Sequence, residues 1–283
     1  MILHITDTHF GAERPQVVHG LIDWARQHRP RLVVLSGDIT QRARAAQFAA
    51  AGAFLQDLCA ASGIDRARDV LLLPGNHDIP LFNLLARVVD PYGGYARFAA
   101  MGLNPLIRRD DVWLIGVNTT RPWRHKHGEI SGAQIERVAA RLHAAPAGAL
   151  RVVVTHQPLW VVERDDYPDR VRNHRAAVNA WCAAGADLLL AGHIHQSFAA
   201  PLPGATDGTW VVQTGTAVSH RIREQVPNTF HVIEPQPAQA GQRARVTRWD
   251  WQGEAFGRIA DAVIPPGRPD QAEEQPPLSA GSW

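Results

Sequence analysis

The chain has 283 residues, of which 45% are apolar and 20% are charged, and its formal net charge is +2. This composition is typical of a globular protein with a sizeable core, and the near balance of charge does not indicate a dedicated nucleic-acid binder. Cys59 and Cys182 lie far apart in no C-x-x-C pattern, so we expect two buried thiols rather than a disulfide framework or a thiolate metal site. No basic leader precedes the first strand and no apolar run approaches about 18 residues, so we expect a cytoplasmic protein with no membrane partner.

The first part of the chain alternates short apolar runs with helical patterns. Strands are predicted at Ile2–Thr6, Leu32–Leu35 and Val70–Leu73, where aliphatic and β-branched residues predominate. Apolar residues recur at helical spacing from Val17 to Pro30 and from Ala43 to Ala61. Strand, helix, strand, helix and strand in this order predict a parallel sheet.

The segment from 79 to 104 has a less regular pattern. It predicts two short helices, Leu81–Val89 and Tyr95–Met101, which could cover a site. Two strands are then predicted at Leu103–Arg108 and Val112–Val117, joined by a polar turn.

The last part of the chain repeats the earlier rhythm and then changes character. Ser131 is expected to cap a helix that runs to Ala145, and a strand, a helix and a strand follow at Arg151–Thr155, Arg175–Ala184 and Asp187–Ala191. Beyond these, short strands without intervening helices indicate an antiparallel extension of a second sheet. They are predicted at Phe198–Ala200, Thr209–Gln213, Phe230–Glu234, Ala244–Trp251 and Phe256–Val263. We predict one domain, residues 1–264, and a disordered tail at 265–283.

Several predicted strands end in side chains that can bind metal ions. These side chains are Asp7, His9, Asp38, Asn76, His77, Asp78, His156, His193 and His195. Each group alone is more often turn chemistry, but loops at one edge of a sheet converge in space, so together they indicate a site. Carboxylate and amide oxygens combined with imidazole favour Mn, Fe, Zn or Co over Mg or Ca.

In this order the motifs resemble those of the calcineurin-like metallophosphoesterases. They are Asp7-Thr8-His9, Gly37-Asp38, Gly75-Asn76-His77-Asp78, His156 and Gly192-His193-Ile194-His195. Within that family the chain is most similar to the bacterial class III cyclic-nucleotide phosphodiesterases. The resemblance implies a four-layer α-β-β-α sandwich of two mixed β-sheets flanked by helices, whereas periodicity alone predicts only an α/β fold with an antiparallel C-terminal portion.

The resemblance also implies a centre of two divalent or trivalent transition-metal ions. It assigns one ion to Asp7, His9, Asp38 and His195, and the other to Asp38, Asn76, His156 and His193. Asp38 would bridge the two ions, because a carboxylate offers one oxygen to each. A hydroxide that bridges the metals would then attack phosphorus.

His77 is the expected catalytic acid, because it follows a ligand without being one and could protonate the leaving oxygen. Many relatives carry an acidic residue three positions after the bridging aspartate, but this chain has Gln41 there. Gln41 can accept from an imidazole N–H through its amide oxygen, but it lacks the charge that would favour imidazolium, so the sequence does not predict what orients His77. Asp78 is expected either to replace the missing carboxylate or to bind nearby backbone amides.

These observations predict a metal-dependent phosphodiesterase acting on a small phosphodiester, with cyclic nucleotides as the family-level substrate. The alternatives are a nuclease, a phosphomonoesterase and, from another class of protein, a non-catalytic scaffold. A nuclease should expose a long basic groove, so a nucleic acid is the less favoured partner. The sequence does not predict the oligomeric state.

Two basic segments lie outside the motifs. The loop at 118–129 contains Arg121, Trp123 and Arg124, and we expect it either to set substrate choice or to be a solvated surface turn. The segment His220–Arg223 is expected either at the rim of the pocket or as a solvated strand end.

Overall fold

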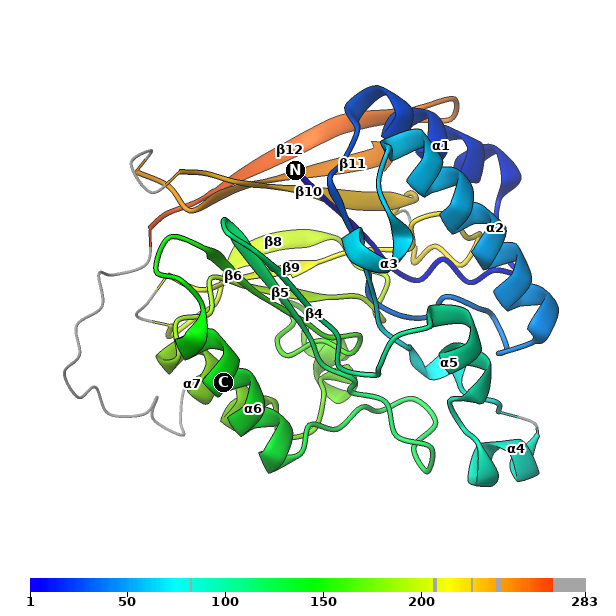
Figure 1. Ribbon diagram of the computed structural model, residues 1–283, viewed down its shortest axis with the longest axis horizontal. Helices are drawn as coiled ribbons and strands as arrows, with labels where there is room; N and C mark the ends of the chain where they lie inside the picture. Colours follow the sequence, from blue (N-terminus) through cyan, green and yellow to red (C-terminus); the bar gives the residue numbers. More distant parts are fainter. Residues whose placement is uncertain (82, 206–207, 225, 238–240, 267–283) are drawn as a thin grey trace.

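Two mixed β-sheets pack face to face with helices outside them in the computed structural model (Figure 1). The structure describes residues 1–266 apart from 82, 206–207, 225 and 238–240. Each sheet contains six strands. The predicted four-layer α-β-β-α sandwich is therefore confirmed. From residue 267 onwards the predicted tail lies outside the described residues, so the proposed domain boundary stays a prediction.

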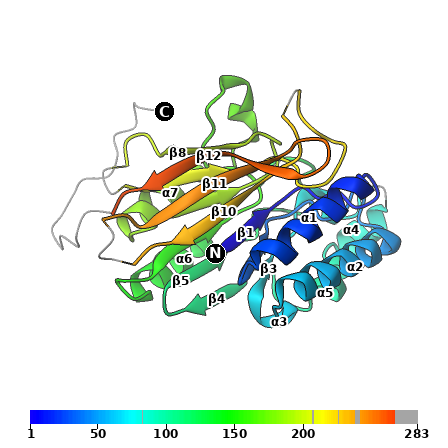
Figure 2. The same ribbon diagram turned by 90° about the horizontal axis from the view of Figure 1, so that it is seen from above.

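The first sheet has the strand order β12-β11-β10-β1-β2-β3. Its strands are β1 (Ile2–Ile5), β2 (Leu32–Leu35), β3 (Val70–Leu72), β10 (Thr229–Pro235), β11 (Ala244–Trp251) and β12 (Phe256–Ile264). Strands β1, β2 and β3 are parallel, as predicted, and β10 pairs antiparallel with β1. Figure 2 shows β10, β11 and β12 extending this sheet beside β1.

The second sheet has the order β4-β5-β6-β7-β9-β8. Its strands are β4 (Leu106–Arg109), β5 (Val112–Gly116), β6 (Leu150–Val154), β7 (Leu188–Ala191), β8 (Phe198–Pro201) and β9 (Trp210–Gln213). The expected antiparallel extension of a second sheet is wrong in two respects. Strand β9 pairs parallel with β7, and β10 to β12 belong to the first sheet. Strand periodicity reports which faces are buried, whereas pairing depends on contacts distant in sequence.

The helices lie outside the sheets. They are α1 (Pro15–His28), α2 (Ala45–Ser62), α3 (Arg66–Asp69), α4 (Leu84–Val89), α5 (Gly93–Ala99), α6 (Gly132–Ala144) and α7 (His174–Ala183). Helices α1 and α2 pack on the first sheet, while α6 and α7 pack on the second (Figure 1). Ser131 caps α6, as predicted, and forms a capping box with Gln134. Helix α7 contains Cys182 and α2 contains Cys59, and both cysteines are buried and free, as expected.

An apolar layer fills the space between the two sheets. It includes Ile2 and Val34 from the first sheet and Val152 and Leu190 from the second, all 0% exposed. The parallel strands of both sheets end in loops at one edge of this layer, and two short 3-10 helices, η1 (Asn76–Asp78) and η2 (Arg164–Asp169), lie in the connections. No helix among the described residues is long and apolar enough to cross a membrane.

Candidate metal centre

The predicted ligands all follow the carboxyl ends of parallel strands. Asp7 and His9 follow β1, Asp38 follows β2, and Asn76 opens η1 just beyond β3. The second sheet contributes from its own strand ends, with His156 after β6 and His193 and His195 after β7. Because these strands are parallel within each sheet and the sheets face each other, side chains distant in sequence meet at one edge.

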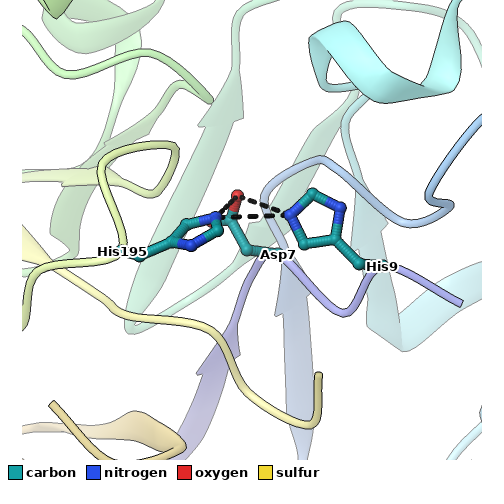
Figure 3. Close-up of side chains that lie close together, drawn as sticks. All are labelled: Asp7, His9 and His195. Atoms are coloured by element: carbon teal, nitrogen blue, oxygen red, sulfur yellow. Dashed lines mark hydrogen bonds and ion pairs between the residues drawn. The ribbon is translucent and has the colours of Figure 1, made fainter. Parts of the chain in front are cut away.

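One cluster consists of Asp7, His9 and His195, whose side chains converge in Figure 3. His195 Nε2 lies 3.2 Å from Asp7 Oδ1, and His9 Nε2 lies 3.7 Å from the same oxygen. The two Nε2 atoms are 3.3 Å apart. A carboxylate oxygen and two imidazole nitrogens thus surround a common point.

A second cluster consists of Asp38, His156 and His193, with Asn76 beside it. His156 Nε2 lies 3.4 Å from Asp38 Oδ1 and 3.3 Å from Asn76 Oδ1. The His193 ring packs edge-on against His156, with the ring centroids 5.1 Å apart.

Asp38 lies between the clusters. Its Oδ1 faces His156, whereas its Oδ2 lies 3.8 Å from His9 Nε2. The two oxygens of one carboxylate therefore point to different sets of imidazoles. This is the arrangement that a bridging ligand needs.

Backbone carbonyls orient two of the imidazoles. His156 Nδ1 lies 2.9 Å from the carbonyl oxygen of Ser36, and His195 Nδ1 lies 2.6 Å from that of Arg221. A carbonyl only accepts, so in both rings Nδ1 donates and Nε2 is the nitrogen that points into the cluster. Such outer contacts are typical of histidines that bind metal ions.

Strained backbone is concentrated at the same loops. Five of the predicted ligands have positive φ angles, namely Asp7, His9, Asp38, His193 and His195. Residues with a Cβ rarely adopt this conformation, and such outliers cluster at functional sites. Gly75 allows a close approach here, because a Cβ at this position would lie 2.1 Å from the backbone nitrogen of Asp38.

The electrostatics of the clusters are those of closely packed carboxylates and imidazoles. Burial would raise the pKa of Asp38, but the neighbouring His156 and His77 hold it well below its usual range. Burial would lower the pKa of His156, but the charge of Asp38 raises it to about 9. Burial and the proximity of His156 lower the pKa of His193 to about 3. Without cations the cluster therefore retains a proton that a metal ion has to displace.

The residues fit a pair of transition-metal ions. Among the described residues, Asp7 Oδ1 and His193 Nε2 are buried polar atoms without a hydrogen-bond partner. Asp7 Oδ2, by contrast, accepts from the Thr6 hydroxyl and from the backbone N–H of His193. Buried polar atoms are normally paired, so the unpaired ones, aimed into clusters of hard and borderline donors, indicate cation binding. The assignment of individual ligands stays a prediction.

His77 lies beside the clusters with 24% of its side chain exposed. Its backbone N–H donates to Asp38 Oδ1 at 2.8 Å, and its Nδ1 donates to the carbonyl oxygen of Gln41 at 2.9 Å. The group that orients His77, which the sequence left open, is thus the backbone carbonyl of Gln41 and not its side-chain amide. The Gln41 amide oxygen instead accepts from Arg221 at 3.3 Å.

Asp78 has the structural role among the two that the sequence left open. Its carboxylate accepts from the backbone N–H groups of Ile39, Thr40 and Gly75. It thereby ties the loop after β2 to the loop after β3. Burial and the nearby charge of Asp38 raise the pKa of Asp78 to about 6.

Arg221 reaches the site from the segment His220–Arg223. Its Nη1 lies 3.1 Å from His77 Nε2. The sequence placed this segment at the rim or in solvent with equal weight, because nothing local links it to the motifs. Its position depends on the loop after β9, which hydrogen bonds to the loop after β1 through the Thr216 hydroxyl and the carbonyl of Asp7.

The loop at 118–129 binds its own arginines. Arg121 donates to the carbonyls of Asn118 and Thr120, and Arg124 pairs with Glu129 at 2.9 Å. Arg121 also donates to the side chain of Gln134 in α6. These contacts hold both guanidinium groups at the loop itself, and a role for this loop in substrate choice stays a prediction.

Comparison with known proteins agrees with the geometry. A family model described as Calcineurin-like phosphoesterase matches residues 1–197. The 3',5'-cyclic adenosine monophosphate phosphodiesterase CpdA of Escherichia coli (strain K12) is 28% identical over 214 residues, 69% of this chain and 69% of that protein.

Two solved structures share the fold. A dimetal phosphatase from Danio rerio has a TM-score of 0.60 at 13% identity and covers 93% of this chain and 98% of its own. Purple acid phosphatase PPD1 from yellow lupin has a TM-score of 0.68 at 12% identity and covers 94% of this chain and 53% of its own. Identities this low show a likeness of fold alone.

Proposed function

The chain belongs to the calcineurin-like phosphoesterase family, and we propose that it is a phosphodiesterase that uses two transition-metal ions to hydrolyse small phosphodiesters. Cyclic nucleotides are the substrate class that we propose first, because CpdA, a cyclic adenosine monophosphate phosphodiesterase, is among the similar proteins. We also propose a cytoplasmic location, since such substrates are found there.

One observation carries the proposal. The cluster around Asp7 and the cluster around His156 share Asp38, whose Oδ2 lies 3.8 Å from His9 Nε2 and whose Oδ1 lies 3.4 Å from His156 Nε2. Two donor sets joined by one carboxylate suit a pair of ions rather than two separate sites. Asp7, His9, Asp38 and His195 would hold one ion, and Asp38, Asn76, His156 and His193 would hold the other.

When bound, the two ions supply a water of lowered pKa and positive charge for the phosphoryl oxygens. Contacts within the chain orient the donor atoms that would hold these ions. The carbonyls of Ser36 and Arg221 keep the Nε2 lone pairs of His156 and His195 directed inward. Asp78 fixes the two loops that carry Asp38 and Asn76. The donors are therefore positioned by backbone contacts before substrate binds.

His77 would donate a proton to the leaving oxygen. Its ring lies at the open side of the clusters, and the hydrogen bond from Nδ1 to the Gln41 carbonyl leaves Nε2 as the atom that faces the site. Proton donation by one general acid typically raises the rate by about 10²-fold to 10⁴-fold. Poor leaving groups depend on it most.

The test is a hydrolysis screen combined with metal analysis of the purified protein. The substrates are an aryl phosphodiester, an aryl phosphomonoester, cyclic adenosine monophosphate and single-stranded DNA, each with Mn²⁺, Zn²⁺ and no added metal. We expect the aryl diester and the cyclic nucleotide to be hydrolysed faster than the monoester and the DNA. Faster hydrolysis of the monoester or of DNA would contradict the proposed substrate class, and no hydrolysis with two ions bound would favour a scaffold.

A further inference from the structure

We propose that Arg221 is a substrate-binding residue whose guanidinium group holds a non-bridging oxygen of the phosphoryl group beside His77. The inference rests on the proposed function and adds a residue outside the predicted ligand set. It gives the site a fixed positive charge on the protein itself, in addition to any bound ions.

The backbone around Arg221 is tied to the metal centre. Its carbonyl oxygen accepts from His195 Nδ1 at 2.6 Å, and its N–H donates to Ser219 Oγ at 3.1 Å. Ser219 Oγ lies 2.8 Å from the hydroxyl of Thr216, which donates to the carbonyl of Asp7. The base of the side chain is therefore held at a fixed place relative to the first cluster.

The side chain points at the reacting region. Nη1 lies 3.1 Å from His77 Nε2 and 3.3 Å from Gln41 Oε1. Gln41 Oε1 is an uncharged acceptor, and His77 Nε2 accepts only while it carries no proton. When Nε2 holds the proton that His77 would give to the leaving oxygen, Nη1 is released for a phosphoryl oxygen. A phosphoryl oxygen carries negative charge and Gln41 Oε1 does not, so the phosphoryl oxygen attracts the guanidinium group more strongly.

The charge of Arg221 is not neutralised by the described part of the chain. No ion pair joins it to a described carboxylate, whereas Arg223, two residues on, pairs with both Asp166 and Glu163. Neither Nη2 nor Nε of Arg221 has a hydrogen bond to a described residue. A cation beside clusters that themselves bind cations is favoured when an anion lies between them.

Other arginines near the site are already engaged. Arg87 donates to the carbonyls of Pro80, Pro122 and Arg124, and it joins α4 to the loop at 118–129. Arg121 is bonded within that loop and to α6. Arg221 differs from these arginines because its guanidinium group lies beside His77 and keeps donors that can hold a phosphoryl oxygen.

The experiment compares phosphate binding by three variants of the metal-loaded protein. Arg221→Met keeps the length of the stem and removes the charge, Arg221→Lys keeps the charge but removes the planar fork, and Arg44→Met removes a charge from an exposed arginine before α2. Inorganic phosphate is titrated by calorimetry, metal content and Tm are measured, and KM and kcat are determined for an aryl phosphodiester.

We expect Arg221→Met to weaken phosphate binding by about 10-fold to 100-fold, as for the loss of a hydrogen bond to a charged group. Arg221→Lys should recover part of this loss, and Arg44→Met should bind phosphate within about twofold of the wild type. Metal content should stay unchanged, because the backbone carbonyl that orients His195 remains in each variant. KM for the diester should rise in Arg221→Met more than kcat falls.

Phosphate affinity in Arg221→Met within about twofold of wild type would overturn the inference, as would an equal loss in Arg44→Met. If Arg221→Met does not fold, Arg221→Lys decides, because full wild-type affinity and KM there would also overturn a role for the fork. Phosphate binding that depends on Arg221 in a protein that hydrolyses no ester would support this subsite while contradicting the proposed function.

Discussion

The apolar layer between the two sheets and the loops that follow its strands differ in how completely their buried groups find partners within the protein. Leu190 lies in the layer with 0% of its surface exposed, between Val154 and Val212 on the neighbouring strands. Three residues further on, His193 has a φ of 76° and a buried Nε2 without a hydrogen-bond partner among the described residues. Packing alone completes the first region, whereas the second keeps buried polar atoms without a hydrogen-bond partner among the described residues.

The two regions also differ in backbone strain. A left-handed conformation costs an L-residue roughly 1–2 kcal/mol, so the strained ligand loops persist because the surrounding sandwich holds them. Substitutions in the layer should therefore reduce stability, whereas substitutions at the strand ends should reduce metal binding and activity.

The largest effect is expected at the shared carboxylate. Asp38→Asn keeps the shape of the side chain and removes its charge, so both ions lose an anionic ligand and face each other with less screening. We expect loss of most bound metal and at least a ~1,000-fold fall in activity. Metal analysis after dialysis and kcat/KM for an aryl phosphodiester measure this. Two tightly bound ions in the variant would show that Asp38 is not the bridge.

His77→Ala should separate metal binding from chemistry at the strand ends. Metal content should remain near that of the wild type, while turnover of diesters with poor leaving groups should fall by about 100-fold to 10,000-fold. Nitrophenyl diesters should lose less, because nitrophenolate leaves without protonation. His143→Ala, which alters an exposed histidine of α6, is the control. Equal losses for all leaving groups would favour a positioning role for His77.

Two substitutions in and after β7 compare the regions directly. In metal-free protein, Leu190→Ala should lower the free energy of unfolding by about 2–5 kcal/mol, because it opens a cavity in the layer. His193→Ala should lower the free energy of unfolding by less than about 1 kcal/mol, because the buried Nε2 that it removes makes no hydrogen bond to a described residue. Denaturant unfolding in the presence of a chelator measures both. A larger loss for His193→Ala would contradict the division between the two regions.

A smaller effect is expected where the layer meets the edge. The hydroxyl of Thr214 lies 3.0 Å from His4 Nδ1 and 2.8 Å from His231 Nδ1. Burial lowers the pKa of His4 to about 3 and holds that of His231 well below its usual value. Both histidines then bind protons in the unfolded chain before they do so in the folded one, so their contribution is present above about pH 6.5 and is lost as the pH falls towards 3.

The pH dependence can be measured in metal-free protein. The two histidines together should cost about 2 kcal/mol of stability between pH 6.5 and 5.5, and His231→Gln should remove about half of that slope. His143→Gln, at an exposed position, should leave the slope unchanged. An unchanged slope in His231→Gln would mean that this residue does not titrate as its burial requires.

Much of the sandwich could be predicted from the sequence because its strands are short apolar runs. The helix after Ser131 was expected to reach Ala145, and α6 ends at Ala144. The parallel pairing of β9 with β7 was not predicted. Strand β8 lies between them along the chain but pairs antiparallel with β9 at the sheet edge, and periodicity carries no information on strand direction. The short helix α3 (Arg66–Asp69) was also missed, because one turn has no period to detect.

The candidate site was predictable to the extent that its residues stand in motifs at strand ends. The positive φ angles at Asp7 and His195 were not predictable, because residue type does not report strain of this kind. The position of Arg221 and the backbone partner of His77 were not predictable either. The first depends on how the loop after β9 meets the loop after β2, and the second on how the loop after β3 meets it, which no local pattern encodes.

Electron paramagnetic resonance of the Mn²⁺-loaded protein tests most directly whether the two clusters form one centre with a shared carboxylate. The protein is titrated with Mn²⁺ until binding saturates, and the spectrum is recorded at each step. A shared carboxylate predicts saturation at about two ions per chain and the signal of an exchange-coupled pair, since bridged ions lie roughly 3.5–4 Å apart. Saturation at one ion, or two ions with the six-line spectra of isolated Mn²⁺, would contradict it.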